Sequence, residues 1–450
     1  MEENLKAKPY QTDEEKIREF QRKVYLKAKQ EKDFKFYILY DKIKMIRFLK
    51  DAYKRVKANK GKCGVDNMTF EKIKEYGEDK YLYEIQKELE TKMYKPSPVL
   101  RVYIPKSNGK QRPLGIPTIK DRIVQMSCKM VIEPIFEADF EDSSYGFRPK
   151  RSAKQAIKKI KEELKEGNTE ILDADLSSYF DSIPHDKLMI LIKQRISDND
   201  VLRLIKMWLK APVKENGKMS GGKKNRKGTP QGGVISPLLS NIYLHLIDKI
   251  INKKNGIFKK VGISIIRYAD DFVLMGKRMN EKIKDKLKEI LKRMDLELNE
   301  DKTRIINAVK MPFDFLGFTI RYDKDLYGTT KRYWNIIPSR KSRKKVRENI
   351  KDFLNKSRHF TPYRIAKGLN EIIIGWINYF NIPKTSYPQE AKRDLRKYLC
   401  CKLYRFYKKK SQRKCKLYRQ NAFEVLVNKH KLIDPSDRVF FGMTPVNVFR

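Results

Sequence analysis

Cysteine and histidine are scarce in this chain of 450 residues, which contains five of the first and four of the second. No two cysteines have the two-residue spacing of metal sites, and they are Cys63, Cys128, Cys400, Cys401 and Cys415. A sparse, odd-numbered set of this kind is typical of a reducing compartment. Because zinc sites need clustered Cys and His ligands, we expect no zinc-binding module.

Long apolar runs are also missing. No stretch approaches the roughly 18 apolar residues that a membrane-spanning helix needs. The opening residues, Met1-Glu2-Glu3-Asn4-Leu5-Lys6, lack the apolar region of a signal peptide. We therefore expect no membrane partner and a cytoplasmic location of the bacterial type.

Acidic residues are too few to balance the basic ones. The chain has 56 Asp and Glu against 102 Lys and Arg, a formal net charge of +46. A charge this large opposes compaction unless an anionic partner offsets it, and nucleic acid is the usual partner. Because 40% of the residues are hydrophobic and 11% aromatic, the chain can still bury cores. The composition favours a folded nucleic-acid-binding protein over a membrane-surface protein or a disordered one.

Hydrophobic patterning predicts four regions. Residues 1–95 are predicted to be helical, and residues 96–165 to begin with a hairpin. In residues 166–335 the order strand, helix, hairpin, helix, strand predicts an α+β fold with an antiparallel, ferredoxin-like sheet backed by helices. Residues 336–450 are predicted to be helical and basic, since positions 340–450 carry 29 Lys and Arg against 8 Asp and Glu.

Local signals refine this outline. Strand-like runs on both sides of Ser107-Asn108-Gly109 predict one hairpin, and runs on both sides of Ala269-Asp270-Asp271 predict another. Helices are expected near 120–140, 152–166, 236–251 and 281–294. Ser236 and Pro237 fit the N-cap and first position of the third of these helices.

Three acids form the main candidate site. Asp270 and Asp271 stand at a hairpin tip, where neighbouring side chains point in different directions. A metal site there needs a further carboxylate, and Asp175, which follows a short strand, is a suitable donor. Carboxylate oxygens suit Mg²⁺, and two such ions would stabilise both the attacking and the leaving oxygens of a phosphoryl transfer. The alternative is a turn with solvated acids.

Two further segments have the composition of nucleotide contacts. The stretch 228–237, with Gln231 and Gly232, would let backbone approach a base or sugar closely. Lys106 and Arg112 stand on the two arms of the first hairpin, where they would clamp a triphosphate. A loop with a helix cap and an ordinary basic hairpin are the respective alternatives.

Taken together and in this order, the motifs resemble the reverse transcriptase family, specifically the group II intron-encoded kind. The resemblance covers roughly residues 96–318 and extends loosely to the C-terminal region. It implies a right-handed polymerase: 1–95 would be an N-terminal extension and the start of the fingers, 96–165 the fingers, 166–335 the palm, and 336–450 the thumb or maturase domain. Arg112-Pro113-Leu114-Gly115-Ile116-Pro117 and Tyr145-Gly146-Phe147-Arg148-Pro149 resemble fingers motifs.

The resemblance also implies a role for single residues. The first catalytic motif would be 175–181, with Asp175 and the Leu176 carbonyl as metal ligands and Phe180 excluding a 2′-hydroxyl. Asp270 and Asp271 would be the other ligands, and Lys302 would protonate the departing pyrophosphate. The deoxynucleotide would contact Lys106, Arg112, Phe180 and Gln231. Template and primer would contact Gly232, Pro237, Phe315, Leu316, Gly317, Arg340, Lys341, Arg343 and Lys344.

The chain departs from the family in two respects. Ser177-Ser178 stands where intron proteins usually carry Lys-Gly, which leaves the carboxylates untouched. No Cys/His cluster of the family's DNA endonuclease follows the thumb-like region. We therefore hypothesise priming from an existing DNA end; strand nicking by purified protein would contradict this.

Three functions compete. The first is RNA-templated DNA synthesis with two Mg²⁺ ions, or Mn²⁺ as substitute, combined with binding of a group II intron RNA that assists splicing and retromobility. The second is a maturase that only assists splicing, and the third is a domesticated relative serving DNA repair or phage defence. The expected partners are an RNA template, a DNA primer and deoxynucleotides, in association with the nucleoid or RNA.

Overall fold

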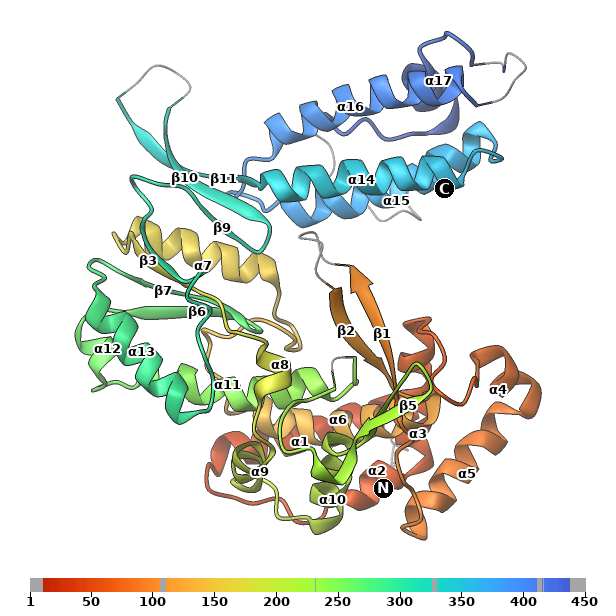
Figure 1. Cartoon of the computed structure of the whole chain (residues 1–450), viewed down its shortest axis with the longest axis vertical. Coiled ribbons are helices and arrows are strands. Elements are labelled where there is room, and N and C mark those ends of the chain that lie inside the picture. The colour runs from red at the N-terminus through yellow and green to blue at the C-terminus, as the bar shows by residue number, and fades with distance from the viewer. Residues whose placement is uncertain are drawn as a thin grey trace, which may run out of the picture. The chain divides into compact units, whose positions relative to one another are not determined.

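The computed structural model describes residues 11–105, 111–230, 232–325, 330–410, 415 and 417–437 (Figure 1). The chain forms two compact units. The first unit comprises Met1–Ser152, Ala174–Leu274 and Asn280–Arg304, and the second unit comprises Ala153–Asp173, Met275–Met279 and Ile305–Arg450. The mixture of helices and sheets confirms the predicted α+β class.

The helices that lie in the first unit are α1 (Asp13–Gln30), α2 (Tyr40–Lys44), α3 (Ile46–Ala58), α4 (Phe70–Tyr76), α5 (Glu78–Glu90), α6 (Ile119–Glu137), α8 (Tyr179–Ser182), α9 (His185–Lys193), α10 (Asn199–Leu209), α11 (Ser236–Asn252), α12 (Ile257–Lys260) and α13 (Glu281–Arg293), with the short 3-10 helix η1 (Gly222–Lys224). Helix α6 is their centre, since it packs against α1 and α3 and most of its side chains are buried. The predicted helices near 120–140, 236–251 and 281–294 are confirmed by α6, α11 and α13.

The first predicted hairpin is present and belongs to a larger sheet. Strand β1 (Val99–Pro105) pairs antiparallel with β2 (Gln111–Ile116), and the turn at 106–110 lies outside the described residues. Strand β1 also pairs in parallel with β4 (Pro212–Glu215), which pairs with β5 (Lys218–Gly221), so the strand order is β2-β1-β4-β5. Strands β4 and β5 were not predicted, because they are short and lie in a stretch dominated by basic and Gly residues.

A second sheet has the strand order β6-β7-β3-β8, and its strands are β3 (Glu170–Ala174), β6 (Ser264–Tyr268), β7 (Asp271–Gly276) and β8 (Arg304–Asn307). The predicted hairpin around 269–271 is confirmed by β6 and β7. Residues Phe272 to Met275 of β7 are almost completely buried. This continuous apolar run is typical of a strand that is covered on both faces.

Within its described residues, the second unit combines a sheet with five helices. The strands β9 (Phe313–Phe315), β10 (Phe318–Lys324) and β11 (Arg332–Pro338) form an antiparallel sheet in the order β11-β10-β9. Its helices are α7 (Ala153–Lys165), α14 (Arg340–Lys356), α15 (Pro362–Phe380), α16 (Gln389–Lys408) and α17 (Ala422–His430). Helix α7 confirms the one predicted near 152–166, and α14 to α17 confirm that the basic C-terminal region is helical.

The predicted start of α11 was wrong for Ser236 and right for Pro237. Ser236 is not an N-cap: α11 begins at Ser236, its N-cap is Ile235, and the Ser236 hydroxyl instead donates to the Pro230 carbonyl at 2.9 Å. Pro237 does stand in the first turn, where a missing N–H costs nothing. Among the described helices, none is both long and apolar enough to cross a membrane.

Candidate active site

The turn between β6 and β7 presents two of the three predicted acids. Asp270 lies in the turn and is partly buried, whereas Asp271 is exposed as the first residue of β7. Ala269 precedes them with a φ of +58°, a left-handed conformation that side chains other than glycine rarely adopt. Such a backbone persists only where its surroundings hold it.

A buried arginine holds this turn. Arg267 and Asp248 are both fully buried, and the Arg267 Nε donates to the Asp248 carboxylate at 2.9 Å. The Arg267 Nη1 donates to the Asn241 side-chain oxygen at 3.0 Å and to the Ala269 carbonyl at 2.9 Å. A charge can remain buried in this way because it is paired and fully hydrogen-bonded.

A glycine on a neighbouring segment closes the same network. The Asn241 side chain donates to the Gly146 carbonyl at 2.8 Å, and a Cβ added at Gly146 would lie 2.2 Å from the Ala269 nitrogen. Only glycine fits there. No sequence motif points to Arg267, Asp248 or Asn241, although an Arg in an otherwise apolar strand is a signal of a buried ion pair.

The third acid, Asp175, is positioned by the segment that follows α13. The Asn299 N–H donates to the Asp175 carbonyl at 2.8 Å, and Leu176 forms an antiparallel bridge with Leu298. This pairing brings Lys302 to Asp175, where its Nζ lies 2.8 Å from the carboxylate oxygen Oδ2. Two predicted site residues 127 positions apart are thus in direct contact.

The electrostatics of Asp270 connect it to two other predicted residues. Burial raises the pKa of Asp270 above its ordinary value, and the negative charge of Asp175 raises it further. The guanidinium of Arg112, exposed on β2, acts in the opposite direction and lowers this pKa. Asp175, Asp270 and Arg112 are therefore close enough to interact, all within the first unit.

A divalent cation would lower the electrostatic repulsion between Asp175 and Asp270. Two carboxylates of like charge, one of them partly desolvated, are stabilised by a cation that both can ligate, and Mg²⁺ typically takes one or two protein carboxylates together with phosphate oxygens. Within the described ranges, however, no three His, Cys, Asp or Glu side chains gather closely enough to hold a metal ion. The charge of Asp175 acts on Asp270, and the ligand roles of Asp175, Asp270, Asp271 and the Leu176 carbonyl all stay predictions.

The segment after Asp175 is tied to the glycine-rich loop. Phe180 lies in the short helix α8, is 8% exposed, and accepts a hydrogen bond at its carbonyl from the Thr229 N–H at 2.7 Å. At the preceding residue of the loop, the Gly228 N–H donates to the Ile183 carbonyl at 2.8 Å. The segment that carries Phe180 and the glycine-rich loop at 228–237, both predicted to contact the nucleotide, are therefore joined by hydrogen bonds.

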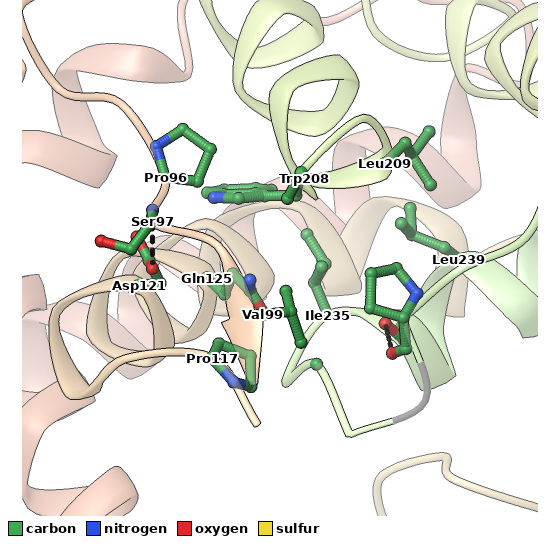
Figure 2. A pocket seen from close by; sticks show the side chains of 14 residues that line it. Pro96, Ser97, Val99, Pro117, Asp121, Gln125, Trp208, Leu209, Ile235 and Leu239 are labelled. Carbon is green, nitrogen blue, oxygen red and sulfur yellow. Dashed lines mark hydrogen bonds between the residues drawn. The ribbon is translucent and has the colours of Figure 1, made fainter. Parts of the chain in front are cut away.

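The far end of this loop is held by α6. The Val234 N–H donates to the Gln125 side-chain oxygen at 2.9 Å, and Gln125 lines a tightly filled hollow of 10 Å³ with Trp208 and Ile235 (Figure 2). Gly232 has a φ of +109°, and a Cβ there would lie 2.3 Å from the Gly115 carbonyl of β2. Gly232 is thus required by the close approach of β2, and its predicted approach to a base or sugar stays a prediction; Gln231 and Lys106 lie outside the described residues.

The residues predicted to contact the primer form a tight turn in the second unit. Leu316 and Gly317 connect β9 to β10, and both have positive φ, +48° and +80°. Two positive φ values are typical of the hairpin turn that matches strand twist. The Tyr379 hydroxyl donates to the Leu316 carbonyl at 2.9 Å, and the Ser342 hydroxyl donates to the Gly317 carbonyl at 2.8 Å. Phe315 is buried, so the exposed part of this predicted contact is the turn itself.

The basic residues at the start of α14 differ in their exposure to solvent and in their acidic partners. Arg340, Lys341 and Lys344 are exposed, and the first turn of α14 contains no acidic residue. Arg343 is 20% exposed at its side chain and lies 3.3 Å from Glu390 and 3.2 Å from Asp394. Arg343 therefore already has acidic partners within the protein.

Comparison with known families agrees with this site. Residues 104–320 match the family model for reverse transcriptase (RNA-dependent DNA polymerase), and residues 343–420 match the group II intron maturase-specific domain. Protein YkfC of Escherichia coli (strain K12) is 39% identical over 293 residues, which cover 58% of this chain and 76% of YkfC.

A second relative and a solved structure complete the comparison. The group II intron-encoded protein LtrA of Lactococcus lactis subsp. cremoris is 32% identical over 342 residues, 62% of this chain and 56% of LtrA. A chain of a partial Cas6-RT-Cas1–Cas2 complex aligns over 56% of this chain and 41% of its own length, with 22% identity and a TM-score of 0.35, which is too distant to carry an argument.

The matched regions define a nucleic-acid polymerase followed by an RNA-splicing domain. The chain belongs to the reverse transcriptase family, in the group II intron-encoded branch that carries the maturase domain. Proteins of this family are RNA-directed DNA polymerases, and they use divalent metal ions.

Proposed function

We propose that this chain copies RNA into DNA at the site formed by Asp175, Asp270 and Asp271. The observation that carries the proposal is the contact of Lys302 with Asp175 at 2.8 Å, and the charges of Asp175 and Arg112 also act on Asp270. Two acids and two bases from four separate segments are brought together in one unit, which solvated turn residues would not require.

The roles of the side chains follow from their charge and position. Asp175 and Asp270 would hold the metal ions, and Asp271 at the start of β7 would supply a further ligand. When bound, two Mg²⁺ ions, or Mn²⁺ in their place, would supply positive charge that stabilises the attacking and leaving oxygens. Arg112, together with Lys106 and Gln231, holds the incoming deoxynucleotide, and Lys302 donates a proton to the departing pyrophosphate.

Phe180 gives the site its preference for deoxynucleotides. The residue is 8% exposed and its carbonyl is bonded to the Thr229 N–H, so it has little freedom to move away from a sugar. A 2′-hydroxyl would meet this fixed ring. Gly232 and Pro237, on the loop and helix that follow, contact the template.

We further propose the right-handed arrangement of fingers (from residue 96), palm (from 166) and thumb (from 336), with 1–95 as N-terminal extension. In this assignment the Leu316–Gly317 turn grips the primer. The exposed cations Arg340, Lys341 and Lys344 bind backbone phosphates, a role favoured by their place at the positive end of a helix.

The maturase domain favours a second, linked activity. Because residues 343–420 match this domain, we propose that the chain binds a group II intron RNA, assists its splicing and uses it as template. Splicing of that RNA with no DNA synthesis would support a splicing-only maturase, and DNA synthesis with no cognate intron would support a domesticated enzyme.

Primer extension tests the central proposal. Purified full-length protein is incubated with an RNA template, a DNA primer, deoxynucleotides and Mg²⁺, with a parallel reaction in excess chelator. We expect extended products only with the metal, and a DNA template of the same sequence serves as comparison. A chain that binds the RNA template and leaves the primer unextended would contradict the proposal.

A further inference from the structure

A hollow of 530 Å³ in the second unit lies apart from every residue assigned above. It is lined by the C-terminal part of α7, by β10 and β11, and by the loop between α15 and α16. Four of the lining residues are aromatic and four are cationic, and its lining includes no carboxylate. This combination differs from an ordinary solvated face, on which charges of both signs alternate.

The aromatic residues form two contacting pairs. The rings of Tyr322 and Trp334, on β10 and β11, have centroids 4.7 Å apart, and those of Tyr333 and Tyr387 have centroids 5.4 Å apart in an edge-to-face arrangement. Trp334 is buried, whereas Tyr387 is 44% exposed. The hollow therefore contains one buried aromatic side chain, Trp334, and one exposed aromatic side chain, Tyr387.

The cations surround these rings. Lys165, Arg332 and Lys384 are exposed, and the Arg332 guanidinium lies 5.9 Å from the centre of the Tyr322 ring. The nearby acid Asp323 is already engaged, since it forms an ion pair with Arg321, whose Nε lies 2.6 Å away, and accepts a hydrogen bond from the Asn335 amide at 2.7 Å. The positive charge of the hollow is therefore not offset by this acid.

Lys161 adds a cation that is buried. It is 8% exposed, and its Nζ donates to the carbonyls of Lys384 and Thr385 at 2.9 and 3.0 Å. It also lies 4.9 Å from the centre of the Tyr387 ring. Within the described ranges no carboxylate forms an ion pair with Lys161, and its charge is held by neutral carbonyl oxygens.

We propose that this hollow binds an unpaired nucleotide of a single strand, with the base stacked on Tyr387 and its phosphates beside Arg332, Lys165 and Lys384. Proteins bind single-stranded nucleic acid with aromatic side chains and cations placed side by side. The aromatic rings stack on the bases, and the cations pair with the negatively charged phosphates. The site deepens the proposed function, on which it rests, by naming a second contact for the RNA partner.

The test measures binding to the full-length chain in the absence of deoxynucleotides. The probes are fluorescein-labelled 12-mers of uridine and of thymidine, with a blunt RNA duplex of equal length for comparison. Tyr387→Ala is expected to weaken binding of the single strands roughly 5- to 100-fold, whereas Tyr387→Phe, which keeps the ring, changes it less than about twofold. Whichever of the two 12-mers shows the larger loss identifies the strand that the hollow prefers.

Charge is tested separately from stacking. Arg332→Gln removes a cation from the hollow, and Lys351→Gln removes an exposed cation of α14 that does not line it. Arg332→Gln is expected to weaken binding several-fold more than Lys351→Gln. Equal effects of these two variants, or duplex binding that falls as much as single-strand binding in Tyr387→Ala, would overturn the proposal.

Photo-crosslinking tests the same site in the parent chain, so its result does not depend on whether a substituted chain folds. A uridine 12-mer with one 4-thiouridine is expected to crosslink to peptides containing Tyr322, Tyr333 or Tyr387. Crosslinks confined to other peptides would also overturn the proposal. A parent chain that gives these crosslinks and fails to extend primers would refute the polymerase proposal alone.

Discussion

The turn that carries Asp270 and the first turns of α14 hold their charges in opposite ways. Behind the first lies a buried network, in which Arg267 is paired with Asp248 and bonded to the Ala269 carbonyl. The second exposes Arg340 and Lys341 at a helix N-terminus, where the helix dipole disfavours positive charge. By contrast, α1 begins with the favourable residues Asp13, Glu14 and Glu15.

This difference teaches what each region requires. Chemistry on a phosphate needs carboxylates fixed to a fraction of an ångström, so their supports are buried and have few acceptable replacements. Binding a phosphate backbone needs only positive charge within reach, so exposed side chains suffice. We therefore expect substitutions at the turn to have large, specific effects and substitutions at α14 to have small, additive ones.

The largest effect is expected for Asp270→Asn. The amide keeps the shape of the side chain and removes the charge that we propose binds the metal, so DNA synthesis should fall by at least about 1000-fold. RNA affinity should remain within about twofold, because the phosphate contacts lie elsewhere. Primer extension and filter binding measure the two quantities, and Asp285→Asn, an exposed acid of α13, is the matched control. Equal loss of synthesis and RNA affinity would identify Asp270 as a structural acid.

Next is Arg267→Met, which leaves the Asp248 charge buried without a partner. Such a change costs about 3–5 kcal/mol in the free energy of unfolding. The double variant Arg267→Met with Asp248→Leu should be more stable than the single one, because it removes both charges. Denaturant titration measures these differences. A single variant as stable as the parent would show that the ion pair does not hold the turn.

The contrast between the two regions also separates what the sequence predicts from what it does not. Asp175, Asp270 and Arg112 could be predicted from motif order, and the hairpins from alternating residues. The contact of Lys302 with Asp175 and the fit of Gly146 against Ala269 depend on long-range packing, which no local pattern encodes. The same holds for Arg343, which the sequence places in a basic run and the structure places between two acids.

An intermediate effect is expected for Phe180→Val. The smaller side chain opens space beside the sugar, so discrimination against ribonucleotides should fall roughly 10- to 200-fold, the range for a change of this size in a steric pocket. Single-nucleotide incorporation with paired deoxy- and ribonucleotides measures the ratio. Phe180→Tyr, which retains the ring, is the control. Unchanged discrimination in the valine variant would mean that another residue excludes the 2′-hydroxyl.

The smallest effects are expected at α14, and there the three basic residues should divide into two groups. Arg340→Gln and Lys341→Gln each remove one exposed cation, so each should weaken RNA binding a few-fold and lower the slope of log affinity against log salt by about 0.7–0.9. Arg343→Gln should leave that slope nearly unchanged and lower the melting temperature instead, because this guanidinium is bonded to Glu390, Asp394 and the Pro338 carbonyl. If all three variants flatten the salt dependence equally, Arg343 leaves its acidic partners to bind phosphate, and the start of α14 is more adaptable than its contacts indicate.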